Sequence, residues 1–367
     1  MKRKILAIII SLIIISISIF FVILPKKEFS ETENRYLEKF PSFSFGSLKS
    51  GEYTQKIEKY LADHFPLRDE FMGAKTVVYK LIGQTKIDGV YLGKDEYLLE
   101  EFVEPENTEK IVNVLNNFAK KIPNCNINFM LIPTSVEINK DKLPKHAINS
   151  SQLEEINKYK DKINFKLINV YDLFTKVTDK IQLYYRLDHH WTTFGAFVAY
   201  LQYCNNEQIK PQTDFNIIKV SNNFNGTLYS KTNDYSLTPD EIYKFDKIEN
   251  EYIIKYVATN RVTNTLYEEK YLNTKDKYSY FLDNNHALIE IENKNINLTE
   301  EIVVIKDSYA NAFIPFLVNN YKKVHVIDPR YYKTDISEYI NKNNIKNVLF
   351  LYNIKTIDDD LGIISVK

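Results

Sequence analysis

The first pattern along the chain is an uninterrupted apolar run, ILAIIISLIIISISIFFVIL, over residues 5–24. It has the roughly 20 residues that a helix needs to cross the hydrocarbon core of a bilayer, so it predicts one transmembrane helix. Basic residues at 2–4 favour a cytoplasmic N-terminus, although the lysines at 26–27 weaken the charge asymmetry. We therefore expect residues 1–25 to anchor the chain in the cell membrane by a single pass, with the remainder on the extracytoplasmic side.

A cleaved signal peptide is the alternative interpretation of this run. The run is long for the apolar core of a signal peptide, and the following LPKKEFSET contains no small-x-small cleavage site. No cysteine follows closely, which excludes a bacterial lipoprotein. These flanks favour a permanent anchor.

Behind the anchor the pattern becomes polar and then helical. Residues 26–50 begin with a charged, proline-punctuated stretch that predicts a short stalk. Residues 53–82 carry apolar side chains at helical spacing, and Pro66 interrupts them, so we expect two helices joined by a corner. Residues 51–367 are long enough to bury a large core and are predicted to form one domain.

From residue 89 onward, apolar strands alternate with helices. A hairpin around a Gly-Lys-Asp turn is predicted at residues 89–98, and a helix at 108–121. The later elements, in chain order, are strands 128–132, 165–170 and 301–305, helix 309–321, strand 324–327, helix 336–342 and strand 348–352. Strands without polar alternation suit a sheet covered on both faces, and strand–helix–strand order favours parallel pairing. The predicted fold class is therefore α/β, with a doubly wound, mostly parallel sheet.

Between the two halves of this pattern, residues 210–298 differ in composition and in the spacing of their apolar residues. They are rich in Tyr, Thr, Val and Asn and contain alternating runs, such as residues 252–257. Alternation with a period of two is typical of half-buried strands. We predict a β-rich insertion here.

Charge and cysteine content narrow the classes of function. Lys plus Arg and Asp plus Glu are equal at 48 each, and the sequence pI is about 7.0, so the chain lacks the basic field that nucleic-acid binding needs. Cys125 and Cys204 stand far apart and form no Cys-x-x-Cys motif, which argues against a zinc cluster. Two small buried residues explain them better than a disulfide, although a single disulfide stays open.

The first candidate for chemistry is Asp188-His189-His190-Trp191, just before an apolar helix. It holds two of the six histidines and the only tryptophan. An Asp two residues from a His can fix the imidazole tautomer and stabilise the imidazolium formed when the His accepts a proton. A helix cap at Thr192 or Thr193 with a buried Trp191 is the structural alternative. A metal site is a further alternative, but adjacent histidines on an extended segment point opposite ways, so we expect only His190 to take part.

The second candidate is Lys306-Asp307-Ser308-Tyr309, directly after the predicted strand 301–305 and at the start of a helix. In doubly wound folds the carboxyl ends of strands face the ligand crevice, and a helix N-terminus offers backbone N–H groups to an oxyanion. Ser308 is placed like a nucleophile. An Asp-Ser helix N-cap is the structural alternative.

Taken together, these residues resemble the DHHW protein family, which is similar to the alginate O-acetyltransferases and, more distantly, to the SGNH hydrolases. The resemblance covers nearly the whole chain behind the anchor. Besides Asp-His-His-Trp and Lys-Asp-Ser, its motifs here are Glu33-Asn34-Arg35, Asp63-His64-Phe65-Pro66-Leu67-Arg68, Gly226-Thr227-Leu228 and Asp328-Pro329-Arg330-Tyr331-Tyr332.

The resemblance implies a permuted SGNH-like fold in which Ser308 is the nucleophile, His190 the general base and Asp188 its orienting acid. The Asp-His pair precedes the serine, as in the alginate acetyltransferase branch. Candidates for holding the oxyanion or the substrate are Gly226, Asn353, Tyr309 and the Ser308 amide. Arg330, just past the predicted strand 324–327, is a further candidate by its position, with a surface pairing to Asp328 as the alternative.

The implied activity is an extracytoplasmic O-acyl (acetyl) transfer to an extracellular or cell-wall polysaccharide. It needs no cofactor and no metal, and a separate multispanning membrane acyltransferase is expected to supply the acyl groups. A carbohydrate esterase of the same fold, a non-catalytic polysaccharide-binding protein and a metal hydrolase stay open as alternatives.

Overall fold

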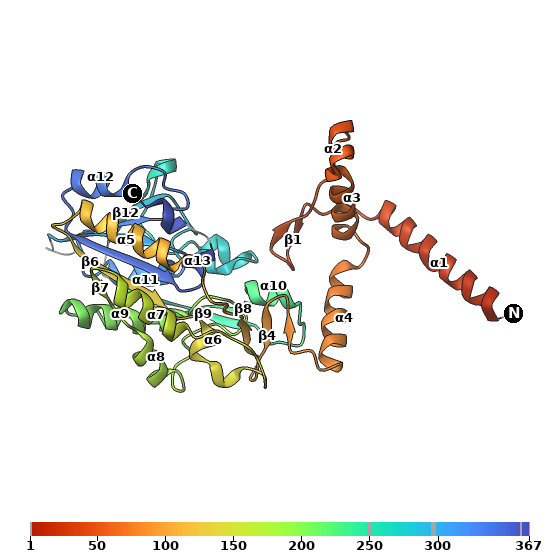
Figure 1. Cartoon of the computed structure of the whole chain (residues 1–367), viewed down its shortest axis with the longest axis horizontal. Coiled ribbons are helices and arrows are strands. Elements are labelled where there is room, and N and C mark those ends of the chain that lie inside the picture. Colours follow the sequence, from red (N-terminus) through yellow and green to blue (C-terminus); the bar gives the residue numbers. More distant parts are fainter. Residues whose placement is uncertain (1, 248–250, 295–298, 360–361, 367) are drawn as a thin grey trace. The chain divides into compact units, whose positions relative to one another are not determined.

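The computed structural model describes residues 2–247, 251–294, 299–359 and 362–366 (Figure 1). The described chain divides into two compact units, one of residues 1–88 and 229–237 and one of residues 89–228 and 238–367. Residue 1 of the predicted anchor (1–25) lies outside the described residues. So do residues 248–250 and 295–298 of the predicted insertion (210–298), and residues 360–361 and 367 of the predicted domain (51–367).

The first unit is mainly helical. It contains α1 (Lys2–Ile23), β1 (Phe29–Ser30), β2 (Arg35–Tyr36), α2 (Phe45–Ser50), α3 (Glu52–Asp63), α4 (Arg68–Leu81) and β3 (Lys86–Ile87). In the described chain one helix, over Lys4–Ile23, is long and apolar enough to cross a membrane, with a mean hydropathy of 3.2 and no buried part. The predicted stalk includes the β1–β2 hairpin and α2, and α3 and α4 meet at a corner at Pro66, as the spacing predicts.

An ion-pair network ties the β1–β2 hairpin to this corner. Arg35 donates to both oxygens of Asp63, at 2.9 and 2.5 Å, and Glu33 accepts from Arg35 and from Arg68. The hydrogen bond from Arg35 lowers the pKa of Asp63 to about 2, against the opposing effect of burial. Two motifs of the sequence, Glu33-Asn34-Arg35 and the segment 63–68, therefore form one structural cluster.

The second unit is built on an eight-stranded sheet. Its helices and strands are β4 (Val90–Leu92), β5 (Leu98–Glu100), α5 (Thr108–Lys121), β6 (Asn126–Ile132), α6 (Ser135–Ile138), α7 (Gln152–Lys162), β7 (Lys166–Leu167), α8 (Tyr171–Val177), α9 (Thr193–Glu207), β8 (Asn216–Phe224), β9 (Asp240–Asp246), β10 (Tyr252–Tyr256), β11 (Arg261–Thr263), β12 (Leu288–Asn293), β13 (Glu301–Lys306), α11 (Ala310–Leu317), β14 (Lys323–Ile327), α12 (Ile336–Lys342), β15 (Asn347–Asn353) and α13 (Thr356–Asp359). Helix α10 (Thr227–Thr232) begins in this unit and ends in the first.

The strand order is β11-β10-β12-β14-β13-β15-β6-β7. Neighbours from β14 to β7 pair in parallel, whereas β12, β10 and β11 continue the sheet in antiparallel register. The mostly parallel sheet is therefore confirmed. The predicted insertion is β-rich, but only β8 and β9 form a separate ribbon, because β10 to β12 extend the edge of the main sheet.

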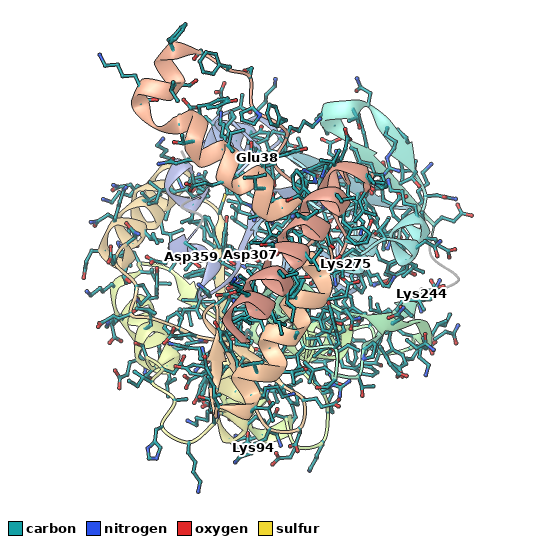
Figure 2. All side chains as sticks on the ribbon, turned by 90° about the vertical axis from the view of Figure 1, so that its right-hand side faces the viewer. Glu38, Lys94, Lys244, Lys275, Asp307 and Asp359 are labelled. Atoms are coloured by element: carbon teal, nitrogen blue, oxygen red, sulfur yellow. The ribbon has the colours of Figure 1, made fainter. Side chains whose placement is uncertain are left out.

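Both faces of the sheet are buried, as the continuous apolar strands require. Along β13, Ile302 and Val304 face a core that includes α8, α9 and α11, while Val303 and Ile305 face a second core with α5, α7 and α12. Lys94, which follows β4, is exposed and is labelled in Figure 2. Helices on both faces make the sheet doubly wound.

Two predicted boundaries are wrong for local reasons. The strand expected at 165–170 is only β7, because the Asn169 side chain accepts from the Tyr171 N–H at 2.8 Å and starts α8. The helix expected at 309–321 ends at Leu317, where Asn319 donates to the last-turn carbonyls of Pro315 and Phe316.

Candidate active site

Ser308 lies where β13 ends and α11 begins, at the carboxyl edge of the parallel strands. The Asp307 N–H donates to Leu351 O of β15, so the chain leaves the sheet only after Asp307. Asp307 then accepts from the Tyr309 N–H at 2.8 Å, which fixes the turn that leads into α11. The capping alternative for Ser308 therefore fails, and its hydroxyl is not used in starting the helix.

A continuous chain of hydrogen bonds joins Ser308, His190 and Asp188. Ser308 Oγ lies 2.8 Å from His190 Nε2, and His190 Nδ1 lies 2.6 Å from Asp188 Oδ1. The His190 backbone N–H also donates to Asp188 Oδ1, at 3.0 Å. Asp188 can only accept, so Nδ1 carries a proton and Nε2 is left to accept the proton of the Ser308 hydroxyl.

The second oxygen of Asp188 is held by Thr227, the first residue of α10. The Thr227 N–H donates to Asp188 Oδ2 at 2.8 Å, and the Thr227 hydroxyl donates to the same oxygen at 3.0 Å. Gly226 lies against this carboxylate, because a Cβ built on it would be 2.3 Å from Asp188 Oδ2. The glycine predicted to hold an oxyanion thus provides the space for Asp188.

Burial and charge set the protonation states of the pair. Burial opposes the ionisation of Asp188, but the nearby histidines and the bonds from His190 and Thr227 hold the pKa of that carboxyl well below its usual range. Burial, assisted by the neighbouring His189, lowers the pKa of His190 to about 4, although Asp188 opposes this. His190 is therefore a neutral acceptor at neutral pH, as a general base must be.

Aromatic side chains fix the plane of the His190 imidazole. The Tyr278 ring stacks on it, with centroids 3.6 Å apart and planes 9° from parallel. Trp191 is fully buried and donates from Nε1 to Tyr309 O at 2.9 Å, which ties the histidine segment to the start of α11. Thr192 also caps α9 by accepting from the Gly195 N–H. The predicted helix cap is therefore present as well as the hydrogen-bond chain, and the two do not exclude each other.

The segment around His189 differs from its prediction. It is bent rather than extended, and the rings of His189 and His190 lie on the same side, with centroids 3.8 Å apart. His189 Nδ1 lies 2.6 Å from the Thr227 hydroxyl. Ligand-type atoms of Asp188, His189 and His190 lie within 4.8 Å of one another, so the expectation that the two histidines point opposite ways is wrong.

The remaining predicted residues are engaged in supporting contacts. Asn353 donates from Nδ2 to Asp307 Oδ2 at 2.7 Å, and its N–H donates to the same oxygen at 2.8 Å. Arg330 donates two hydrogen bonds to Asp328, at 2.8 and 2.6 Å. This is the pairing that was predicted as the alternative to a role in oxyanion binding. The buried Tyr309 donates its hydroxyl to His189 O. Among the described residues, the Ser308 N–H has no protein acceptor.

Sequence reasoning missed three residues that shape the site. Thr227 was noted only as part of a motif, and Tyr278 lies in the insertion, where no local signal marks it. Lys306 is completely buried, and its ammonium contacts Asn285 Oδ1 at 2.5 Å, Asn311 Oδ1 at 2.8 Å and Asp328 Oδ2 at 3.6 Å. A lysine at the end of an apolar strand was the available signal.

Titration of His190 tests this electrostatic description without any assay of activity. Because burial disfavours the imidazolium, we expect His190 to titrate near pH 4, below the ordinary value of 6.5, in nitrogen-detected NMR of the folded chain. The unfolded chain binds that proton more readily, so stability falls as the pH drops from 6.5 towards 4. His190→Gln identifies the resonance, and a midpoint at or above pH 6.5 would contradict the prediction.

Substitution Gly226→Ala tests the packing against Asp188. The added methyl group would overlap the carboxylate, so we expect the free energy of unfolding to fall by about 1–3 kcal/mol. Chemical denaturation measures this loss. The matched control is Gly46→Ala, where the nearest atom is Ser44 Oγ at 4.0 Å and no loss is expected. Equal stability of both variants would show that Gly226 is not packed in this way.

Solved structures with a similar fold cover most of the chain. A DHHW family protein from Eubacterium siraeum aligns with a TM-score of 0.66 and 23% identity, covering 77% of this chain and 94% of that one. Bacillus cereus PatB1 aligns with a TM-score of 0.60 and 25% identity, covering 73% and 97%, and a second structure of it carries a sulfonyl adduct. The O-acetyltransferase domain of Pseudomonas putida AlgJ is more remote, with a TM-score of 0.48 and 13% identity over 74% of this chain and 92% of that domain.

No curated protein matches the chain in sequence. The DHHW protein family matches it over residues 85–327, which include Asp188, His190 and Ser308. This range is more than half of the 367 residues. The chain therefore belongs to the DHHW protein family.

Proposed function

We propose that this protein is a membrane-tethered O-acyltransferase that carries the acyl group on Ser308. The observation that carries the proposal is the hydrogen-bond chain from Ser308 Oγ through His190 to the buried Asp188. Those three groups have the geometry and the protonation states that nucleophilic acyl transfer requires.

The reaction proceeds in two steps. Ser308 Oγ attacks the carbonyl carbon of an acyl donor while its proton passes to His190 Nε2, and the tetrahedral intermediate then expels the leaving group, which takes that proton. In the second step an acceptor hydroxyl gives its proton to His190 and attacks the acyl-serine. Ser308 leaves with the proton, so the enzyme is restored and one ester has replaced another.

The oxyanion of both intermediates needs donors close to Ser308. The Ser308 N–H is the first candidate, because no described protein group accepts from it and it lies at the start of α11. Arg330 is the second candidate, since its side chain is partly exposed beside Asp328 at the end of β14. The other three predicted residues are assigned positioning roles. Gly226 makes room for Asp188, Asn353 holds Asp307, and Tyr309 bonds to the carbonyl of His189.

The acceptor and the location follow from the family and from α1. The resemblance of the DHHW family to the alginate O-acetyltransferases supports acetyl transfer to an extracellular or cell-wall polysaccharide. A single apolar helix at the N-terminus supports a tether with the site on the extracytoplasmic side. Acyl groups on that side need a carrier through the membrane, which supports a multispanning acyltransferase as partner.

Intact mass after incubation with an activated acetyl ester tests the proposal. We expect one acetyl adduct on the full chain and none on Ser308→Ala, with a loss of ester turnover of about a thousand-fold or more. Ser337→Ala, a buried serine at the start of α12, should keep the adduct. An adduct that survives in Ser308→Ala would rule out this nucleophile.

A further inference from the structure

A groove of about 740 Å³ opens in the second unit, within the segment that the sequence predicts as the insertion. One wall is the end of β8, residues 220–223, and the other is formed by the two short 3-10 helices Glu269–Asn273 and Lys277–Tyr280. The lining is mainly polar, with the side chains of Ser221, Asn222 and Asn223 on the β8 wall.

The β8 wall is irregular where it meets the groove. Its pairing with β9 shifts register between Lys219 and Ser221 and again between Ser221 and Phe224. Such bulges leave residues out of the ladder and re-aim their side chains, and they are frequent beside active sites. Asn222 and Asn223 are consequently exposed at the groove rather than paired across the ribbon.

Each wall continues directly into a residue that holds the triad. Thr227, which donates twice to Asp188, follows the β8 wall by four residues. Tyr278, which stacks on His190, is next to the lining residue Lys277. The groove and the hydrogen-bond chain therefore share their framework.

The charged residues that line the groove are Glu269, Lys270 and Lys277, so neither sign of charge dominates and a neutral ligand suits it. Lys270 is paired with Asp283 at 2.7 Å, and Lys277 donates to the carbonyls of Leu272 and Thr274 at 2.7 and 3.0 Å. The two ammonium groups that line the groove are thus already engaged, while amide and hydroxyl side chains remain for sugar hydroxyl groups.

We propose that this groove is the acceptor subsite and that it holds a neutral, hydroxyl-rich oligosaccharide. This inference rests on the proposed function, because the groove would present one sugar hydroxyl to the acyl-serine. That hydroxyl loses its proton to His190 Nε2, forms the new ester bond and releases Ser308. Water in the same place would give hydrolysis, so occupation of the groove decides between transfer and hydrolysis.

The experiment compares the double variant Asn222→Leu/Asn223→Leu with the full-length parent, using cellohexaose as acceptor and p-nitrophenyl acetate as donor. Loss of two hydrogen-bonding amides should lower the ratio of transferred to hydrolysed acetyl about ten-fold. Asn205→Leu, an exposed position on α9, is the matched control and should keep the parent ratio. An unchanged ratio in the double variant, or a parent that forms the acetyl-serine but never acetylates cellohexaose, would overturn the proposal.

Binding separates this inference from the proposed function. Calorimetry of cellohexaose on Ser308→Ala measures the subsite without any acyl transfer. Binding that the double variant weakens would support the subsite even if no acetyl adduct formed on the parent. An acetyl adduct together with undetectable binding would refute the subsite and leave the nucleophile in place.

A different observation concerns α4 of the first unit, which carries an unpartnered apolar stripe. Phe71, Ala74, Val78 and Leu81 follow one another at spacings of three and four residues, so they share one face of the helix, and Leu67 directly precedes it. They are exposed, with 62% of Leu67, 58% of Phe71 and 81% of Leu81 accessible.

The opposite face of α4 is the one that packs within the unit. Gly73 meets the Tyr235 ring so closely that a Cβ would lie 2.4 Å from it, and Lys80 pairs with Asp234 at 2.9 Å. The packing contacts of α4 within the unit are therefore made by the face opposite the stripe. The exposed stripe is not needed for them.

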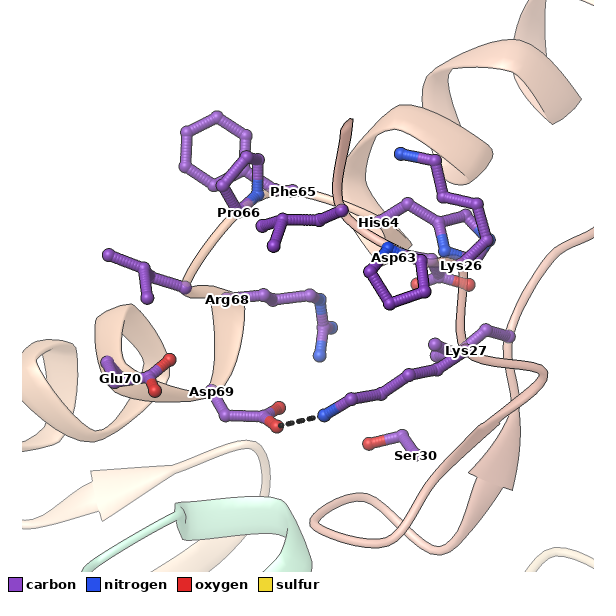
Figure 3. A pocket seen from close by; sticks show the side chains of 14 residues that line it. Lys26, Lys27, Ser30, Asp63, His64, Phe65, Pro66, Arg68, Asp69 and Glu70 are labelled. Atoms are coloured by element: carbon purple, nitrogen blue, oxygen red, sulfur yellow. Dashed lines mark ion pairs between the residues drawn. The ribbon is translucent and has the colours of Figure 1, made fainter. Parts of the chain in front are cut away.

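The start of the stripe lies at the end of α1. Residues 24–27, which follow α1, line one cavity of about 260 Å³ together with residues 63–70, and Lys27 pairs with Asp69 at 3.8 Å (Figure 3). The Phe21 ring of α1 also contacts Tyr60 of α3. If α1 spans a bilayer, these contacts hold Leu67 at the level of the lipid headgroups.

We infer that α4 is an interfacial helix whose stripe rests on the lipid surface beside the anchor. The inference rests on the proposed anchor. Amphipathic helices bind in this way, with the apolar face in the boundary between headgroups and acyl chains. The alternative occupants of the stripe are the second unit, a second copy of the chain and a partner protein. Any of them would keep the stripe away from lipid.

Tryptophan quenching by brominated lipids tests the position of α4 in full-length chains reconstituted into phosphatidylethanolamine–phosphatidylglycerol bilayers. The native Trp191 is buried and gives a constant background. We expect Phe71→Trp fluorescence to fall to roughly half or less, and Phe45→Trp, an exposed phenylalanine on α2, to stay unquenched.

Ile13→Trp within α1 distinguishes the two proposals. Quenching at position 13 without quenching at 71 would overturn the interfacial helix and keep the anchor. Quenching at 71 without quenching at 13 would refute the anchor and support the helix alone. Equal quenching at positions 45 and 71 would show that α4 has no special contact with lipid.

Discussion

The ionised carboxylate of Asp188 is the group around which the second unit has to be organised. Removing a carboxylate from water costs several kcal/mol unless hydrogen bonds replace its hydration. Asp188 is 2% exposed and accepts from two groups of His190 and from two groups of Thr227, which lies 39 residues further along the chain than Asp188. Satisfying one charge therefore joins the histidine segment to the start of α10 and fixes the tautomer of His190 in the same arrangement.

The parallel strands bring the nucleophile to this charge. β13, β14 and β15 end at the same edge, where Ser308 and Asp328 follow β13 and β14 and where Asn353 is the last residue of β15. Asp307 receives three hydrogen bonds there, from the Tyr309 N–H and from two donors of Asn353, so the turn before α11 is fixed by the neighbouring strand. A serine whose backbone is held this firmly can keep its hydroxyl directed at His190 without using it as a cap.

The strand and helix periods predicted the sheet, its two covered faces and the edge at which Ser308 lies, because those features depend on local burial. The Asp188, His190 and Ser308 set followed from motif spacing and family resemblance. Gly226, Thr227 and Tyr278 could not be placed, since their contacts with Asp188 and His190 are made across long sequence separations. The bend at His189 was also missed, because it depends on bonds to Thr227 rather than on the residues beside it.

A buried cation, Lys306, lies two residues before Ser308 in the chain. Burial lowers the pKa of Lys306 to about 8, against the opposing effect of Asp328, so the ammonium stays largely protonated at neutral pH. Its partners come from β14 and from the loop before β12, and Asn311 lies on the first turn of α11. Moving Ser308 and the start of α11 away from His190 would therefore draw Asn311 away from Lys306 and leave that buried charge with one partner fewer. That cost makes the spacing of nucleophile and base a property of the folded core rather than of the loops around it.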